Sequence, residues 1–163
     1  MTDFLTTPTD ASVRTLPSRD WTLTAAAPIV AAVDGSPASG AVIAEALRLG
    51  RDLAAPVIFV YVRRDSARFL DGSVSQRQLT RDMAAARQVI DEALVEAGRA
   101  RVDAEAEILE GHPQERIVTF ARDRNARLLV VGRRARRFRR SISRGVIAAA
   151  RLPVVIVQEH DPP

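Results

Sequence analysis

Five short apolar segments recur along this chain, and a stretch with the periodicity of a helix separates each neighbouring pair. The segments cover residues 28–33, 56–62, 102–109, 127–131 and 153–157. Strands and helices that alternate with short connections favour a parallel sheet built by right-handed crossovers, with helices on both faces. The pattern therefore predicts one doubly wound α/β domain with a five-stranded parallel sheet, which fits the length of 163 residues.

The composition of these segments predicts the place of each strand in the sheet. The first, second and fourth are continuously apolar, as strands buried on both faces are. The third alternates apolar residues with Asp103, Glu105 and Glu107, which is typical of an edge strand. The usual order 3-2-1-4-5 of a doubly wound sheet places the third strand at one edge and the fifth at the other.

The fifth segment is apolar from Pro153 to Val157, although the predicted order places it at an edge. An uncovered apolar edge invites pairing with another strand. We expect the same strand of a second copy to cover it in a symmetric homodimer. The alternative cover is the N-terminal extension of the chain itself.

The regions outside the predicted domain differ from it in composition. Residues 1–26 mix Thr, Pro, Asp and Ala without a sustained period, so we predict a flexible N-terminal extension, a domain over residues 27–158 and a tail over residues 159–163. No run approaches the roughly 18 apolar residues that cross a bilayer, and the start lacks the pattern of a signal peptide. We therefore expect a cytoplasmic protein without a transmembrane segment.

Inside the domain, helix boundaries are marked by particular residues. Ser36 and Pro37 predict the start of the first helix, because serine caps helices and proline fits the first turn. Gly98 predicts the end of the second helix, since glycine is favoured where a helix stops.

The residue types that carry most catalytic and metal chemistry are scarce. Cysteine is absent, which excludes disulfides, thiolate nucleophiles and zinc–cysteine sites, and all 24 basic residues are arginine, so no Walker lysine exists. His112 and His160 are the only histidines, and we expect neither a metal site nor a catalytic constellation. The formal charge of +4 is unevenly spread, because seven arginines from Arg133 to Arg144 contribute +7 and leave about −3 for the rest.

Two loops meet where the strand order reverses, between the first and fourth strands, and parallel α/β sheets hold ligands at this point. One loop contains Asp34 to Pro37, and the other contains Gly132, the arginine run and Ser141.

The residues that carry a resemblance are the stretches IVAAVDGS (29–36), IFVYV (58–62), GHP (111–113), LLVVG (128–132) and LPVVIV (152–157). In this order they resemble the universal stress protein family over residues 28–158. The resemblance implies the fold of the adenine nucleotide α-hydrolases.

Family members that bind ATP have a loop of the form G-x-x-G, nine residues and G-[S/T], whose amides hold the phosphates. Here Gly132 matches the first glycine, and Ala135 stands in place of the second. One alignment keeps nine residues and puts Gly145 on the final glycine, without a hydroxyl after it. The alignment that we prefer is anchored on the following helix and last strand. It gives Arg140 and Ser141 as the final pair, followed by Ile142, with a loop five residues shorter.

The resemblance implies an adenosine pocket lined by Asp34, Val62 and Val131. The alternative role of Asp34 is to cap the following helix. The complete predicted site is Asp34, Val62, Val131, Gly132, Ala135, Arg140, Ser141 and Ile142. Because Ala135 and Arg140 replace glycines, we expect ATP or another adenine nucleotide to bind in weakened or altered form, with Mg²⁺ only if ATP is bound.

The predicted function is that of a non-catalytic module in stress response or signalling. The alternative is an anion-docking module that uses the run from Arg133 to Arg144 to bind an acidic protein, nucleic acid or anionic surface without nucleotide. Only Phe138 interrupts this run, so we do not expect sequence-specific nucleic acid binding. An enzyme of the adenine nucleotide hydrolase type would require a glycine-rich pyrophosphate loop, which is missing.

Overall fold

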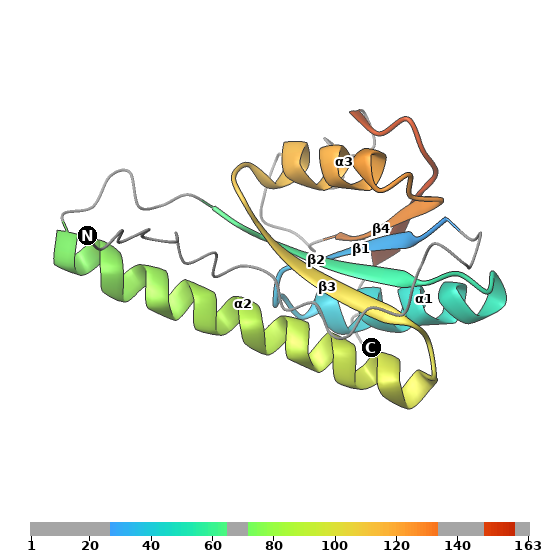
Figure 1. Ribbon diagram of the computed structural model, residues 1–163, viewed down its shortest axis with the longest axis horizontal. Coiled ribbons are helices and arrows are strands. Elements are labelled where there is room, and N and C mark those ends of the chain that lie inside the picture. The colour runs from blue at the N-terminus through green and yellow to red at the C-terminus, as the bar shows by residue number, and fades with distance from the viewer. Residues whose placement is uncertain (1–26, 65–71, 134–148, 159–163) are drawn as a thin grey trace, which may run out of the picture.

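The computed structural model describes residues 27–64, 72–133 and 149–158. Its strands are β1 (Ile29–Val33), β2 (Val57–Arg63), β3 (Ala104–Glu110), β4 (Leu128–Arg133) and β5 (Val154–Gln158), and its helices are α1 (Ala38–Asp52), α2 (Gly72–Ala100) and α3 (Pro113–Asp123) (Figure 1). All neighbouring strands pair in parallel, in the order β3-β2-β1-β4-β5. The predicted doubly wound fold and strand order are confirmed. The predicted fourth helix falls largely on residues 134–148, which lie outside the described residues.

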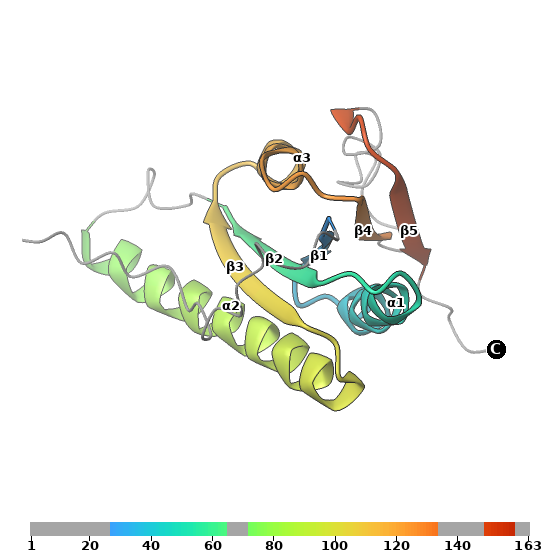
Figure 2. The ribbon, with the colours of Figure 1, turned by 45° about the vertical axis from the view of Figure 1, so that its right-hand side comes forward.

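The sheet separates two layers of helices. Helices α1 and α2 cover one face, and α3 covers the other (Figure 2). Because successive side chains of a strand point to opposite faces, β1 and β2 supply residues to both cores. Ile29, Ala31 and Phe59 pack towards α1 and α2, whereas Val30 and Ile58 pack towards α3. This double burial explains why the central strands are apolar throughout.

Helix α2 is longer than the strands that it packs against. Its 29 residues span about 43 Å at a rise of about 1.5 Å per residue. Strands β2 and β3 have seven residues each, or about 23 Å at about 3.3 Å per residue. The first half of α2 therefore projects beyond the end of the sheet (Figure 1). Within the described part of the chain, no helix is both apolar and long enough to cross a membrane.

At the amino end of the sheet, each described helix returns to the next strand through a residue in the left-handed conformation. These residues are Ala54, Arg101 and Asn125, with φ of 49°, 54° and 50°. In each turn that residue donates a backbone hydrogen bond three residues back, and the next residue donates one five residues back, which is the Schellman pattern. The expectation that Gly98 ends α2 is wrong, because the helix runs to Ala100 and Arg101 takes the left-handed position.

The two edges of the sheet differ in chemistry. β3 forms one edge, as predicted from its alternating pattern. Its Glu105 and Glu107 accept hydrogen bonds of 3.4 and 2.8 Å from Arg124, whose guanidinium lies over the Phe120 ring. β5 forms the other edge, and Ile156 there is 40% exposed. The acidic edge resists pairing with a further strand, whereas the apolar edge does not.

Candidate ligand site at the carboxyl end of the sheet

The turn between β1 and α1 is organised by Ser39. Its hydroxyl accepts hydrogen bonds of 3.1 Å from the backbone amides of Asp34 and Gly35, and it donates one of 3.2 Å to Asp34 Oδ1. Ser39 is only 7% exposed and is the one buried polar residue among those that the structure describes. Ser39 was not among the predicted site residues, although its place in the first turn of the predicted helix was a signal.

Asp34 lies exposed at the end of β1, and its carboxylate faces its own turn. Asp34 Oδ1 accepts a hydrogen bond of 3.0 Å from the Ser36 amide in addition to the bond from Ser39. The alternative role of Asp34, as a cap of the following helix, is not realised, because Pro37 holds the N-cap position of α1 and no side chain caps it. The carboxylate is bonded within its own turn instead. Two bonds to one oxygen fix the orientation of the carboxylate, which is what a binding residue requires.

Glycine allows close packing at both loops of the switch point. Gly35 has a φ of +72°, and a Cβ there would lie 3.0 Å from Val89 of α2. At Gly132 a Cβ would lie 3.1 Å from Val42 Cγ2 and 3.3 Å from the Cβ of Ala38. Gly132 thus lets the start of α1 approach the end of β4. The rest of the loop after Gly132 lies outside the described residues, so its meeting with the loop of residues 34–37 stays a prediction.

The two predicted valines lie on the α3 face of the sheet. Val131 is 2% exposed and belongs to the α3-side core, and Val62 is partly buried against the same core. Val33 pairs with Tyr61, so the next residues, Asp34 and Val62, are level on neighbouring strands. Asp34 and Val62 are therefore brought close together, whereas the Val131 side chain serves mainly as core.

A second polar group closes the ends of β2 and β3. Arg63 is level with Glu110, and their side chains form an ion pair. The Gly111 amide donates a 3.0 Å hydrogen bond to the Arg63 carbonyl, with Gly111 at a φ of +129°. His112 follows as the N-cap of α3, exposed and without a capping side-chain bond. The predicted second strand ended at Val62, one residue short of β2, and Arg63 was not among the predicted site residues.

The remaining predicted site residues, Ala135, Arg140, Ser141 and Ile142, lie outside the described residues, and so does most of the arginine run. The preferred alignment of the phosphate loop stays a prediction. Among the residues that the structure describes, no group of three His, Asp or Glu side chains could hold a metal ion.

The strand order, the crossovers and the polar turns at the switch point define a doubly wound α/β domain of the kind that binds ligands beyond the carboxyl ends of its strands. This chain belongs to the universal stress protein family, whose family model matches residues 26–158. No protein with a curated description matches it.

Solved structures support this assignment. A universal stress protein from Archaeoglobus fulgidus is 27% identical, with a TM-score of 0.66 over 79% of this chain and 91% of that one. A structure of the Archaeoglobus fulgidus protein in complex with dAMP is 26% identical, with a TM-score of 0.65 over 79% and 95% of the two chains. The universal stress protein UspA from Lactobacillus plantarum, 21% identical with a TM-score of 0.71 over 82% and 99%, shares the fold.

Proposed function

We propose that this chain is a non-catalytic universal stress protein that acts in stress response or signalling and binds an adenine nucleotide in weakened form. The observation that carries this proposal is the switch point, where Asp34 and Val62 are level and Gly132 packs against α1. The dAMP complex of the 26% identical Archaeoglobus fulgidus protein supports the choice of ligand. Structures described with bound AMP and cyclic AMP are less similar in sequence.

The adenosine half of the ligand would lie against Asp34 and Val62. The Asp34 carboxylate can accept hydrogen bonds from a ribose or base, and its two bonds within the turn hold it in place. The apolar surface of the partly buried Val62 can pack against the flat face of a base.

The phosphate half would lie over the loop that begins at Gly132. In the preferred alignment Ala135 and Arg140 replace glycines, which weakens an amide cradle, and Ser141 and Ile142 open the following helix. Arginine side chains can substitute in part, because a guanidinium binds phosphate oxygens in pairs. Mg²⁺ would enter only with ATP, held mainly by the phosphates.

The proposal also covers the oligomeric state of the protein and the limits of its domain. The exposed apolar side of β5 favours a symmetric homodimer through residues 153–157, and Ile156→Asp should shift the sedimentation of a dimer to that of a monomer. The domain occupies residues 27–158 of a cytoplasmic protein, with an extension over residues 1–26 and a tail over residues 159–163.

The arginine run supports a second candidate function. Seven positive charges from Arg133 to Arg144 favour docking to an acidic protein, nucleic acid or anionic surface without nucleotide. Such binding falls steeply as salt rises, because bound counterions are released from the partner. Salt dependence therefore separates the two candidates.

The test is calorimetric titration of the full chain with ATP, AMP, cyclic AMP and a short duplex DNA at two salt concentrations. We expect one saturable event per chain with a nucleotide, weakened about tenfold by Asp34→Ala, since a lost hydrogen bond to a charged group costs on the order of 1.5 kcal/mol or more. Asp34→Asn keeps the Oδ1 acceptor and the turn, and so isolates the charge. Asp123→Ala, exposed at the end of α3, is the control.

Two results would decide against the nucleotide. If no adenine nucleotide binds at millimolar concentration, the chain does not use the switch point in this way. If binding occurs only to DNA, with steep salt dependence and no effect of Asp34→Ala, the docking function replaces the nucleotide function.

A further inference from the structure

The side of α2 that points away from the sheet is exposed along its length. Ile90, Ala93 and Ala97 are buried in the core between α2 and the sheet. The opposite side, which we call the outer stripe, borders an open groove of about 600 Å³ in its second half, where Val95 is 53% exposed. At helical spacing, the exposed residues of the outer stripe are Arg77, Arg81, Ala84, Gln88, Glu92 and Val95.

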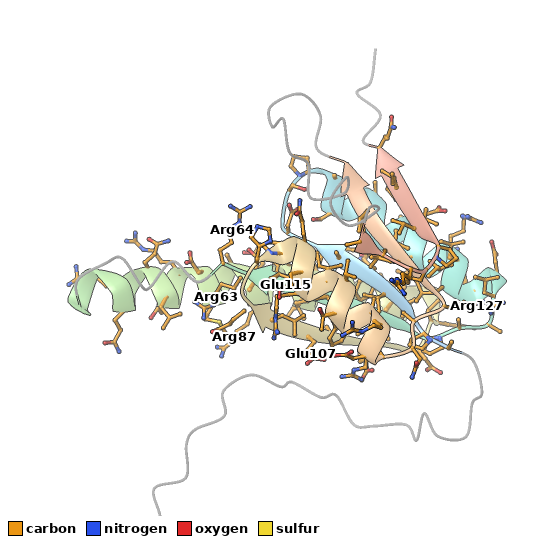
Figure 3. All side chains as sticks on the ribbon, turned by 90° about the horizontal axis from the view of Figure 1, so that it is seen from above. Arg63, Arg64, Arg87, Glu107, Glu115 and Arg127 are labelled. Atoms are coloured by element: carbon orange, nitrogen blue, oxygen red, sulfur yellow. The ribbon has the colours of Figure 1, made fainter. Side chains whose placement is uncertain are left out.

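The charges of α2 are sorted along the helix. Residues 72–87 include three arginines and one aspartate, a net charge of +2. Residues 88–100 include three carboxylates and one arginine, a net charge of −2. Figure 3 shows Arg87, the last residue of the positive half, near the end of the sheet, beyond which the first half of α2 projects. The helix dipole favours the reverse order of charges, so electrostatics within the helix do not explain this arrangement.

The outer stripe has charged groups that the rest of the described chain does not use. Arg77 and Arg81 are exposed, and neither forms a hydrogen bond or ion pair with another described residue. Glu92 accepts one hydrogen bond of 3.1 Å from Gln88 and keeps further acceptor capacity. Arg81 and Glu92 cannot meet within one chain, because eleven residues of helix separate them by about 16 Å. Their charges are open to a second molecule.

A second copy of α2 that runs antiparallel matches this order of charges. The midpoint of α2 is residue 86, so pairing over the full length places Arg81 opposite Asp91 and beside Glu92 of the partner subunit. Each positive half then faces a negative half. At the centre Ala84 lies opposite Gln88, and the small alanine lets the two helices approach closely. The projecting half of each helix (Figure 1) lies over the half of the other that packs on its own sheet.

We propose that the outer stripe of α2 is an interface with a second copy of this chain, in which the two helices pair antiparallel around residue 86. The interface is separate from the β5 edge, because α2 packs on β2 and β3 at the other side of the sheet. It does not depend on the proposed nucleotide binding. One helix pair buries less than the roughly 800 Å² per partner of a standard interface, so the association is weak and reversible.

Analytical ultracentrifugation of the full chain with Ile156→Asp tests the interface, since this substitution removes the β5 edge from the measurement. The protein concentration is raised to about 0.5 mM, where weak association becomes measurable. We expect self-association at an ionic strength of about 0.02 M and its loss at about 0.5 M, because salt screens exposed charges. If this parent chain does not self-associate at low ionic strength, the proposal is overturned.

Two charge reversals in the same parent chain test the antiparallel pairing. Arg81→Glu places carboxylate against carboxylate, and Glu92→Arg places guanidinium against guanidinium; Asp91 is left unchanged because it has another interaction. Each variant alone should raise the dissociation constant about tenfold, since a dimer loses two ion pairs and gains two repulsions. In an equimolar mixture each chain meets the complementary charge on the other, so the mixture should associate about as tightly as the parent.

Arg122→Glu and Glu115→Arg are the matched controls, because both positions are exposed on α3, on the other face of the sheet. Each control should keep a dissociation constant within about twofold of the parent. The proposal is overturned if the mixture of Arg81→Glu and Glu92→Arg associates no more tightly than either variant alone. It is also overturned if the controls weaken association equally, because the net charge of the chain would then account for the effect.

Discussion

The chain reverses direction at both ends of the sheet, and the turns at the two ends are built differently. At the amino end, three turns repeat one backbone pattern around Ala54, Arg101 and Asn125, and each is closed by backbone hydrogen bonds. At the carboxyl end, the described turns differ from one another and use side chains, such as that of Ser39 in one and that of Arg63 in another. The described turns of the amino end thus rest on backbone bonds, whereas those of the carboxyl end also use side-chain bonds.

The two ends of the sheet also differ in how they accommodate backbone strain and close packing. The amino end places ordinary residues in the left-handed conformation, which costs roughly 1 kcal/mol each. The carboxyl end uses glycine at Gly35, where φ is positive, and at Gly132, where two side chains leave little room. Substitutions at the two ends should therefore have opposite effects on stability.

The largest effect is expected at Gly132. A valine there would press against Val42 and Ala38, and such overpacking costs roughly 1–3 kcal/mol of the free energy of unfolding. Urea denaturation measures this loss. The control is Gly40→Ala, since a Cβ at this exposed position of α1 meets nothing within 4 Å and alanine should add roughly 0.5–1 kcal/mol. If Gly132→Val does not lower the free energy of unfolding relative to Gly40→Ala, the close approach of α1 and β4 is contradicted.

The next effect is expected at Ser39. Ser39→Ala leaves the amides of Asp34 and Gly35 without their acceptor and should cost about 1–3 kcal/mol in urea denaturation. Ser36→Ala is the control, because Ser36 bonds to Asp34 through its backbone amide, and this bond survives the change. Equal stability of the two variants would mean that the turn is not organised by Ser39.

The smallest effect sharpens the comparison from the amino end. Arg101→Gly relieves a left-handed arginine and should stabilise the chain by up to about 1 kcal/mol. Asn125→Gly should gain less, because asparagine tolerates this conformation better. Thermal unfolding of both variants measures the difference. A larger gain for Asn125→Gly would contradict the account of these turns.

The fold was predictable because hydrophobic pattern and topology are linked. Strands buried on both faces must be apolar throughout, so the alternation of Glu105 and Glu107 marked the β3 edge. The end of α2 was not predictable from glycine, because Arg101 takes the left-handed position and its turn is stabilised by backbone bonds that leave no sequence signal.

The candidate site was predictable only in part. The end of β1 and the position of Gly132 follow from the strand order, since both lie at the switch point. Ser39 was missed because a serine early in a helix is common. Its role depends on the conformation of the turn before the helix, which brings the amides of Asp34 and Gly35 to its hydroxyl. Arg63 was missed because an arginine after a strand usually lies in solvent, and its pairing with Glu110 depends on the register between β2 and β3.

The most direct test of the account is a map of AMP binding on the backbone amide signals of the ¹⁵N-labelled chain. The account predicts saturable shifts at the carboxyl end, at Asp34, Gly35, Val62 and Gly132, while the amides of Ala54, Arg101 and Asn125 at the amino end stay unchanged. Shifts at the amino end, or none at the carboxyl end with saturating AMP, would contradict it.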